Sequence, residues 1–243
     1  MGVKDYLAHS RASRYSLLFA LPLLLLYEGL SFALTGSAVE GVRNGADVLL
    51  KSLFLAIGGR HGLTIFNVVL VAIGAALIWR DRRANRGPLE GRVFAWMFAE
   101  SAVYAGLFGV VVGSLTALVL DAPRLLQIGG GALGLPTQLV ISLGAGIYEE
   151  LLFRVLLTGG LLWGLRMVLG MGRGGAAVGA VLISALIFSA FHYVGALGDR
   201  FTAASFIFRA IAGVAFSGLY VTRGLGITAW THALYDIGLT LLT

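Results

Sequence analysis

The sequence predicts an all-α fold, a polytopic bundle of transmembrane helices, and three observations carry that prediction. Hydrophobic residues make up 58% of the 243 residues and charged residues 12%, which is about half the charged share of a soluble domain. Glycine accounts for 35 residues, about twice its usual 7%, and small residues let membrane helices approach closely. Long apolar stretches recur along the whole chain. These features exclude a soluble enzyme, a secreted disulfide scaffold and a disordered tail.

About seven stretches are long enough to cross a bilayer as helices, which takes about 20 apolar residues. They are residues 16–34, 62–79, 93–120, 137–157, 176–194, 202–221 and 224–242. The fourth helix either continues past Gly159 and Gly160 or breaks there. The stretch 46–57 is shorter and contains Asp47 and Lys51, which favours a short interfacial or re-entrant helix; an eighth span is the alternative.

Positive charge sets the expected orientation, because cytoplasmic loops carry an excess of Lys and Arg. With the N-terminus in the cytoplasm, most bases fall on the inner side, and the arginines of 80–92 are the strongest anchor. The outer bases are Arg43, Lys51, Arg60, Arg124 and Arg200. Topology thus accounts for the net charge of +6, and no nucleic-acid partner is expected. We expect one integral, multi-pass domain over 1–243 in a prokaryotic inner or cell membrane.

Ionisable side chains inside these spans are the candidate functional residues, because they are costly in a bilayer and usually face partners in the bundle interior. Six of them form three short sets in the second half of the chain: Glu149, Glu150 and Arg154; His192; His232 and Asp236. The chain has no cysteine, which removes thiol nucleophiles and thiolate metal sites. Three other buried charges are expected to form a network that braces the helices: Glu28, Glu100 and Arg209.

The first set assigns roles by helical geometry. Glu150 and Arg154 are four residues apart, share a helix face and are expected to form an ion pair. Glu149 points in another direction, because successive helical residues are about 100° apart, and it is therefore available as a general base. In the alternative interpretation both glutamates are ion-pair partners, with Arg209 serving Glu149.

The other two sets add imidazoles. Phe188 and His192 lie one helical turn apart, although a single histidine on an apolar helix is more often a hydrogen-bonded core residue. His232 and Asp236 also share a face, where such a pair can orient the imidazole, bind a metal or stabilise an oxyanion. One carboxylate with two histidines inside apolar helices is what hydrolysis by an activated water requires.

The three motifs resemble those of a known family. Glu149-Glu150-x-x-x-Arg154, Phe188-x-x-x-His192 and His232-x-x-x-Asp236 match, in order and spacing, the type II CAAX prenyl endopeptidase group. This is the CPBP or Abi family of intramembrane proteases, which also contains proteins like lysostaphin resistance protein A. The resemblance covers residues 137–242, the expected catalytic core. Residues 1–120 add only apolar helices of unassigned role.

The resemblance implies an endopeptidase that cleaves a membrane-embedded or lipid-anchored protein substrate with a glutamate-activated water. Glu149 would be the general base, His192 would help to hold the water, and His232 with the residue at 236 would stabilise the oxyanion. Glu150 and Arg154 would brace the motif helix, with Phe188 as structural support. The family accepts Asn or Asp in the last position, and Asp236 is the acidic variant. An ionised Asp236 cannot donate to an oxyanion, so it is either protonated or orients His232.

Family members are often labelled metalloproteases, and a zinc ion held by Glu149, His192 and His232 is possible. We favour no cofactor, because the chain lacks a His-Glu-x-x-His helix and a ligating Glu149 leaves only the Arg-paired Glu150 as base. A non-catalytic protein, such as a proton-linked transporter, a scaffold or an immunity protein, is the alternative function. We see no inverted repeat of the kind usual in transporters. The expected topology places His192 toward the outer side, whereas a prenylated CAAX tail would arrive from the cytosol.

Overall fold

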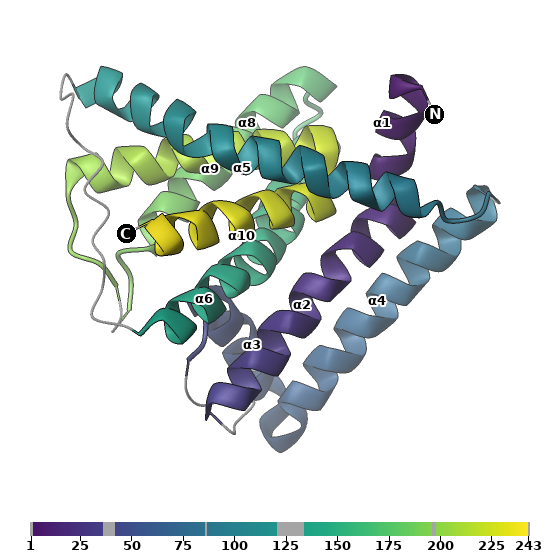
Figure 1. Cartoon of the computed structure of the whole chain (residues 1–243), viewed down its shortest axis with the longest axis horizontal. Helices are drawn as coiled ribbons and strands as arrows, with labels where there is room; N and C mark the ends of the chain where they lie inside the picture. Colours follow the sequence, from purple (N-terminus) through teal and green to yellow (C-terminus); the bar gives the residue numbers. More distant parts are fainter. Residues whose placement is uncertain (1, 36–41, 86, 121–133, 196–197, 243) are drawn as a thin grey trace.

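The computed structural model describes residues 2–35, 42–85, 87–120, 134–195 and 198–242, and it is helical without a strand in those residues. The first half contains α1 (Val3–Arg11), α2 (Ser13–Thr35), α3 (Gly45–Gly58), the 3-10 turn η1 (Gly59–His61), α4 (Gly62–Ala84) and α5 (Gly91–Leu120). The second half contains α6 (Leu135–Gly144), η2 (Ala145–Thr158), α7 (Gly159–Met167), α8 (Arg173–Phe191), α9 (Ala203–Arg223) and α10 (Leu225–Leu242). The predicted all-α bundle is confirmed (Figure 1).

Five helical stretches of the described residues are long and apolar enough to cross a membrane. They are Ser13–Leu34, Gly45–Ala84, Gly91–Leu120, Arg173–Phe191 and Ala203–Arg223. The other two predicted spans, 137–157 and 224–242, are also helical, and both carry motif residues. Their crossing of the bilayer stays a prediction.

The short helix predicted at 46–57 exists as α3. Asn44 caps the first turn of α3 by accepting a hydrogen bond from the backbone N–H of Ala46. The helix ends at Gly58, and Gly59, with a φ of 53°, begins the turn η1 that leads into α4. The 14 residues of α3 extend about 21 Å, too short for a hydrocarbon core of about 30 Å. α3 and α4 therefore form a hairpin rather than two crossings.

The fourth predicted helix continues past Gly159 and Gly160, so the alternative of a break there is wrong. The backbone stays right-handed helical at Gly144 and Gly159, and α6, η2 and α7 form one run from 135 to 167. Its middle part, η2, is a π-helix in which the Thr158 hydroxyl reaches the Phe153 carbonyl at 2.7 Å. π-Helical turns are rare and frequently occur at functional sites; here η2 holds the whole first motif.

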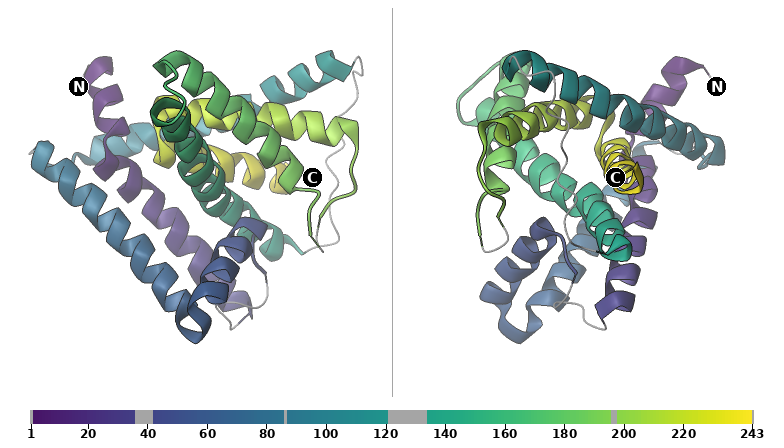
Figure 2. Two further views of the ribbon diagram at one scale, coloured as in Figure 1. Left: turned by 180° about the vertical axis from the view of Figure 1, so that it is seen from behind. Right: turned by 60° about the vertical axis from the view of Figure 1, so that its left-hand side comes forward.

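The last helix, α10, occupies the middle of the bundle. It packs against α2, α5, α6, α9 and η2, and Figures 1 and 2 show it flanked by α5 on one side and by α2 and α6 on the other. The third motif therefore lies in the interior of the molecule. Helices from the N-terminal half form part of its surroundings.

Ionic contacts gather the inner bases of the predicted topology at one end. Arg14 approaches Asp81 at 3.4 Å and donates to the carbonyl of Gly87 at 2.6 Å, so the N-terminus meets the α4–α5 connection. At the α9–α10 turn Arg223 donates to Ser10 at 2.8 Å. This grouping agrees with the predicted alternation of the helices, while the side of the membrane stays a prediction.

Candidate active site

Glu150 and Arg154 form the predicted ion pair in the interior. Both side chains are fully buried, and Arg154 Nε lies 3.1 Å from Glu150 Oε2. The other oxygen of Glu150 accepts a hydrogen bond of 2.7 Å from His232 Nδ1. Glu150 thus joins η2 to α10, which the spacing of the first motif alone did not reveal.

Glu149 faces a different neighbour, as the geometric argument predicts. Its side chain is half-buried, and Oε1 accepts a hydrogen bond of 2.8 Å from Asn44 Nδ2. His192 and His232 both interact electrostatically with this carboxylate. The alternative pairing with Arg209 is wrong, because Arg209 instead pairs with Asp199 and bonds to Ser205.

His192 lies at the end of α8 rather than inside a helix. The prediction extended this helix to residue 194, but it ends at Phe191 and His192 is its C-cap. His192 Nδ1 donates to the carbonyl of Phe188 at 2.9 Å, and the two rings meet edge to face at 4.8 Å. Because a carbonyl only accepts, the proton of a neutral imidazole is on Nδ1. The Nε2 lone pair is therefore available to a ligand or a water.

His232 bridges two carboxylates. Its Nδ1 faces Glu150, and its Nε2 lies 3.6 Å from Asp236 Oδ2. Its ring stacks on Phe216 at 4.3 Å. With Nδ1 donating to Glu150, a neutral His232 presents the Nε2 lone pair toward Asp236, and a protonated His232 presents an N–H there.

Exposure divides the motif residues into two groups. Glu149, His192 and Asp236 are half-buried and so have accessible surface, with 28% of the Asp236 side chain exposed. Glu150, Arg154 and His232 are buried. The groups open to a small ligand are therefore the carboxyl groups of Glu149 and Asp236 and the imidazole of His192, and a buried charged layer supports them.

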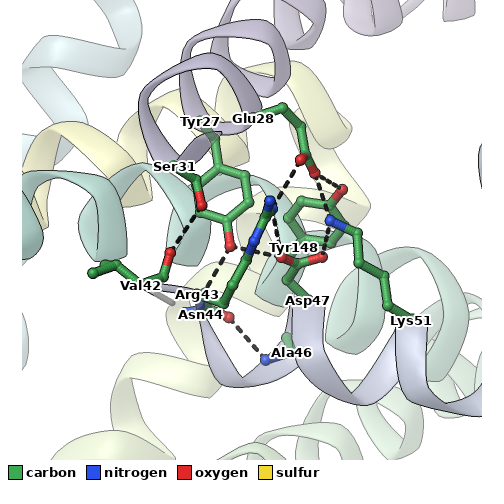
Figure 3. A network of polar contacts seen from close by, with 10 residues as sticks. All are labelled: Tyr27, Glu28, Ser31, Val42, Arg43, Asn44, Ala46, Asp47, Lys51 and Tyr148. Atoms are coloured by element: carbon green, nitrogen blue, oxygen red, sulfur yellow. Dashed lines mark hydrogen bonds and ion pairs between the residues drawn. The ribbon is translucent and has the colours of Figure 1, made fainter. Parts of the chain in front are cut away.

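Sequence reasoning missed the contribution of the N-terminal half. Besides Asn44, an ion cluster reaches Tyr148, the neighbour of Glu149: the Tyr148 hydroxyl donates to Glu28 at 2.5 Å (Figure 3). The rest of the ion cluster consists of Tyr27, Arg43, Asp47 and Lys51. An Asn before an apolar run, such as Asn44, indicates a helix N-cap. This local pattern does not reveal that Asn44 contacts Glu149, which lies 105 positions away in the sequence.

The predicted bracing network of Glu28, Glu100 and Arg209 is wrong as a single unit. Glu28 belongs to the ion cluster with Arg43 and Lys51. Glu100 pairs with Arg223 at 2.6 Å and accepts from Tyr6. Each acid is satisfied by the nearest base of a packed neighbour, so three local networks replace the expected one. Asp47 is also fully buried rather than interfacial.

A zinc site made of Glu149, His192 and His232 does not fit the described part of the chain. No group of three or more His, Asp and Glu side chains there is arranged to hold a metal ion. We therefore derive no step through a metal, and the metal-free mechanism stays a prediction.

Comparison with known families agrees with the motifs. Residues 131–238 match the model described as type II CAAX prenyl endopeptidase Rce1-like. Residues 131–238 thus resemble a Rce1-like domain. This match, which includes all three motifs, confirms the resemblance and supports a CAAX-type intramembrane protease at the level of the family. No curated protein and no solved structure matches the chain. Together with its apolar helices, the Rce1-like domain makes this an integral membrane protein.

Proposed function

We propose that the protein is an intramembrane glutamic endopeptidase in which Glu149 activates a water molecule. The observation that carries the proposal is the contrast between the two adjacent glutamates. Glu150 is buried between Arg154 and His232, whereas Glu149 has accessible surface near both histidines. Only Glu149 can therefore meet a water and a peptide carbonyl together.

In the proposed reaction, the water oxygen attacks the peptide carbonyl while Glu149 takes one water proton. Glu149 and the Nε2 lone pair of His192 orient the water from two sides. The C–N bond then breaks, and the proton on Glu149 passes to the leaving amine. Atoms and charges balance without another reactant, and the carboxylate is regenerated.

The oxyanion side of the proposed site consists of His232 and Asp236. His232 Nε2 and Asp236 Oδ2 lie 3.6 Å apart, and a proton carried by either atom can be donated to developing negative charge. Glu150 keeps the imidazole oriented through Nδ1. Asp236 thus acts in its protonated form or through His232, and an ionised Asp236 is not itself the donor.

The proposed substrate is a membrane-anchored protein with a prenylated CAAX tail, the class that the Rce1-like family implies. A prenyl chain would enter the bilayer and bring the adjacent peptide bond to the depth of the motif helices. A prenylated peptide should therefore be cleaved faster than the same peptide without its lipid. Equal cleavage of the two peptides would contradict the lipid requirement but would leave the proposed endopeptidase activity standing.

The decisive experiment compares Glu149→Gln with Glu150→Gln in the purified full-length protein, using a prenylated CAAX peptide. Loss of a general base should lower kcat by about 100- to 10,000-fold in Glu149→Gln while the thermal unfolding midpoint stays unchanged. Glu150→Gln instead weakens the support of buried Arg154 and should lower the free energy of unfolding by about 3 kcal/mol. Wild-type activity of Glu149→Gln would exclude the proposed mechanism.

Chelation tests the absence of a metal cofactor. We expect the purified enzyme to keep its kcat after prolonged incubation with a strong chelator, because Glu149 acts as base and not as ligand. Metal analysis of the same sample should find no stoichiometric zinc. Activity that disappears with chelator and returns with zinc would contradict this prediction.

A further inference from the structure

We infer that Asn44, which lies outside the Rce1-like domain, is a positioning residue for Glu149. Its side chain is buried, and Nδ2 donates to Glu149 Oε1 at 2.8 Å. The inference rests on the proposed function, in which Glu149 is the base, and deepens it. It gives a helix of the N-terminal half a direct part in the site.

The orientation of the Asn44 amide is determined by the start of α3. Oδ1 accepts a hydrogen bond of 2.8 Å from the backbone N–H of Ala46, as an N-cap does. With Oδ1 engaged, the other end of the amide, Nδ2, must point the opposite way, and there it meets Glu149. The amide therefore presents only N–H to the carboxylate.

The backbone of Asn44 is held equally firmly. Its N–H donates to the Tyr27 hydroxyl at 3.0 Å, and that hydroxyl donates to Asp47 at 2.7 Å (Figure 3). Gly144 lets η2 approach closely, because a Cβ at this position would lie 2.7 Å from Asn44 Cβ. Asn44 is thus a rigid donor, connected to both α2 and α3.

A rigid donor on Oε1 restricts how Glu149 can turn. It keeps Oε1 occupied and leaves Oε2 as the oxygen that can accept a water proton. A buried amide serves this purpose better than a water, since it cannot exchange during turnover. The expected effect is on kcat, because Asn44 acts through Glu149 and not on the substrate.

Three variants of the full-length protein separate this role from helix capping. Asn44→Asp keeps a good N-cap but replaces the N–H donor with a second carboxylate, so kcat should fall about 100-fold with unchanged KM. Asn44→Ser keeps a cap but is too short to reach Glu149, so kcat should fall about 10-fold. Asn85→Asp makes the same change at the end of α4 and should leave kcat unchanged. Thermal unfolding in detergent should be similar for Asn44→Ser and Asn85→Asp, whereas the second buried carboxylate of Asn44→Asp should lower its unfolding midpoint.

The outcomes distinguish this inference from the proposed function. Wild-type kcat in Asn44→Asp and Asn44→Ser, with Glu149→Gln inactive, would overturn the role of Asn44 alone. A raised KM at unchanged kcat would also overturn it, because Asn44 would then contact substrate. An active Glu149→Gln would overturn the proposed function. If Asn44→Asp fails to fold, Asn44→Ser decides, since serine retains the cap without introducing a charge.

Discussion

Arg154 places a whole guanidinium group inside the bundle. Its side chain is fully buried, and neither Nη1 nor Nη2 has a hydrogen-bond partner among the described residues. The charge is compensated by Glu150 and by the face of Phe188, whose ring centre lies 4.4 Å from Arg154 Cζ. Glu150 also accepts from His232, so the pair couples the first motif to the third.

Arg154→Met tests that coupling. The substitution leaves Glu150 without its cation, and breaking a buried pair costs about 3–5 kcal/mol, so thermal unfolding should occur at a markedly lower temperature. The double variant Glu150→Gln/Arg154→Met removes both charges and should recover part of the loss. Chemical denaturation in detergent measures both. A double variant less stable than either single variant would contradict a charge-pairing role.

At the scale of elements, two glycines let the motif helix contact its neighbours. Gly144 faces Tyr27 and Asn44, while a Cβ on Gly146 would lie 2.5 Å from Ala233 Cβ and 2.7 Å from the Ala229 carbonyl. The close contact of η2 with α10 is what brings Glu150 within hydrogen-bond reach of the adjacent His232. Two of the many glycines therefore allow close helix packing at the candidate active site.

Gly146→Ala should separate η2 from α10. Overpacking of this kind costs about 1–3 kcal/mol, and kcat should fall as well because His232 moves away from Glu150. Gly160→Ala is the matched control in the same helical run, where a Cβ meets nothing within 4 Å. That variant should be neutral or slightly stabilising. Unfolding midpoints and kcat measured on both proteins provide the check, and equal behaviour of the two would contradict the packing argument.

At the scale of the whole molecule, ion pairs organise the two ends differently. The end with the N-terminus has Arg14 at the α4–α5 connection and Arg223 at Ser10. Toward the other end, Arg43 and Lys51 are neutralised by Glu28 and Asp47. Arg43 and Lys51 therefore belong to a buried ion cluster, and Arg14 and Arg223 are likewise paired with acids at the N-terminal end.

The absence of cysteine makes the predicted topology directly testable. Arg82→Cys and Arg60→Cys each introduce one thiol at an exposed position, the first near the end of α4 and the second in η1, just before α4 begins. In intact cells a membrane-impermeant maleimide should label Arg60→Cys and not Arg82→Cys, and permeabilised cells should show labelling of both. The reverse pattern in intact cells would place the N-terminus outside.

Composition and spacing alone predicted the membrane bundle, most helix positions and the pairing of Glu150 with Arg154. These depend on apolar length and on neighbours within one helical turn, which are local properties of the chain. The whole of α1 and the end of α8 at Phe191 were missed, because hydropathy marks long apolar stretches and not short polar helices or helix ends.

Only the tertiary structure decided which distant groups meet. His232 bonds to Glu150 across 82 positions and Asn44 to Glu149 across 105, and no local pattern encodes such contacts. They arise because glycine-mediated packing brings η2 against α10 and the start of α3. The sequence by itself therefore determined that Glu150 pairs with Arg154 one helical turn away, and packing determined that Glu150 also meets His232 and that Glu149 meets Asn44.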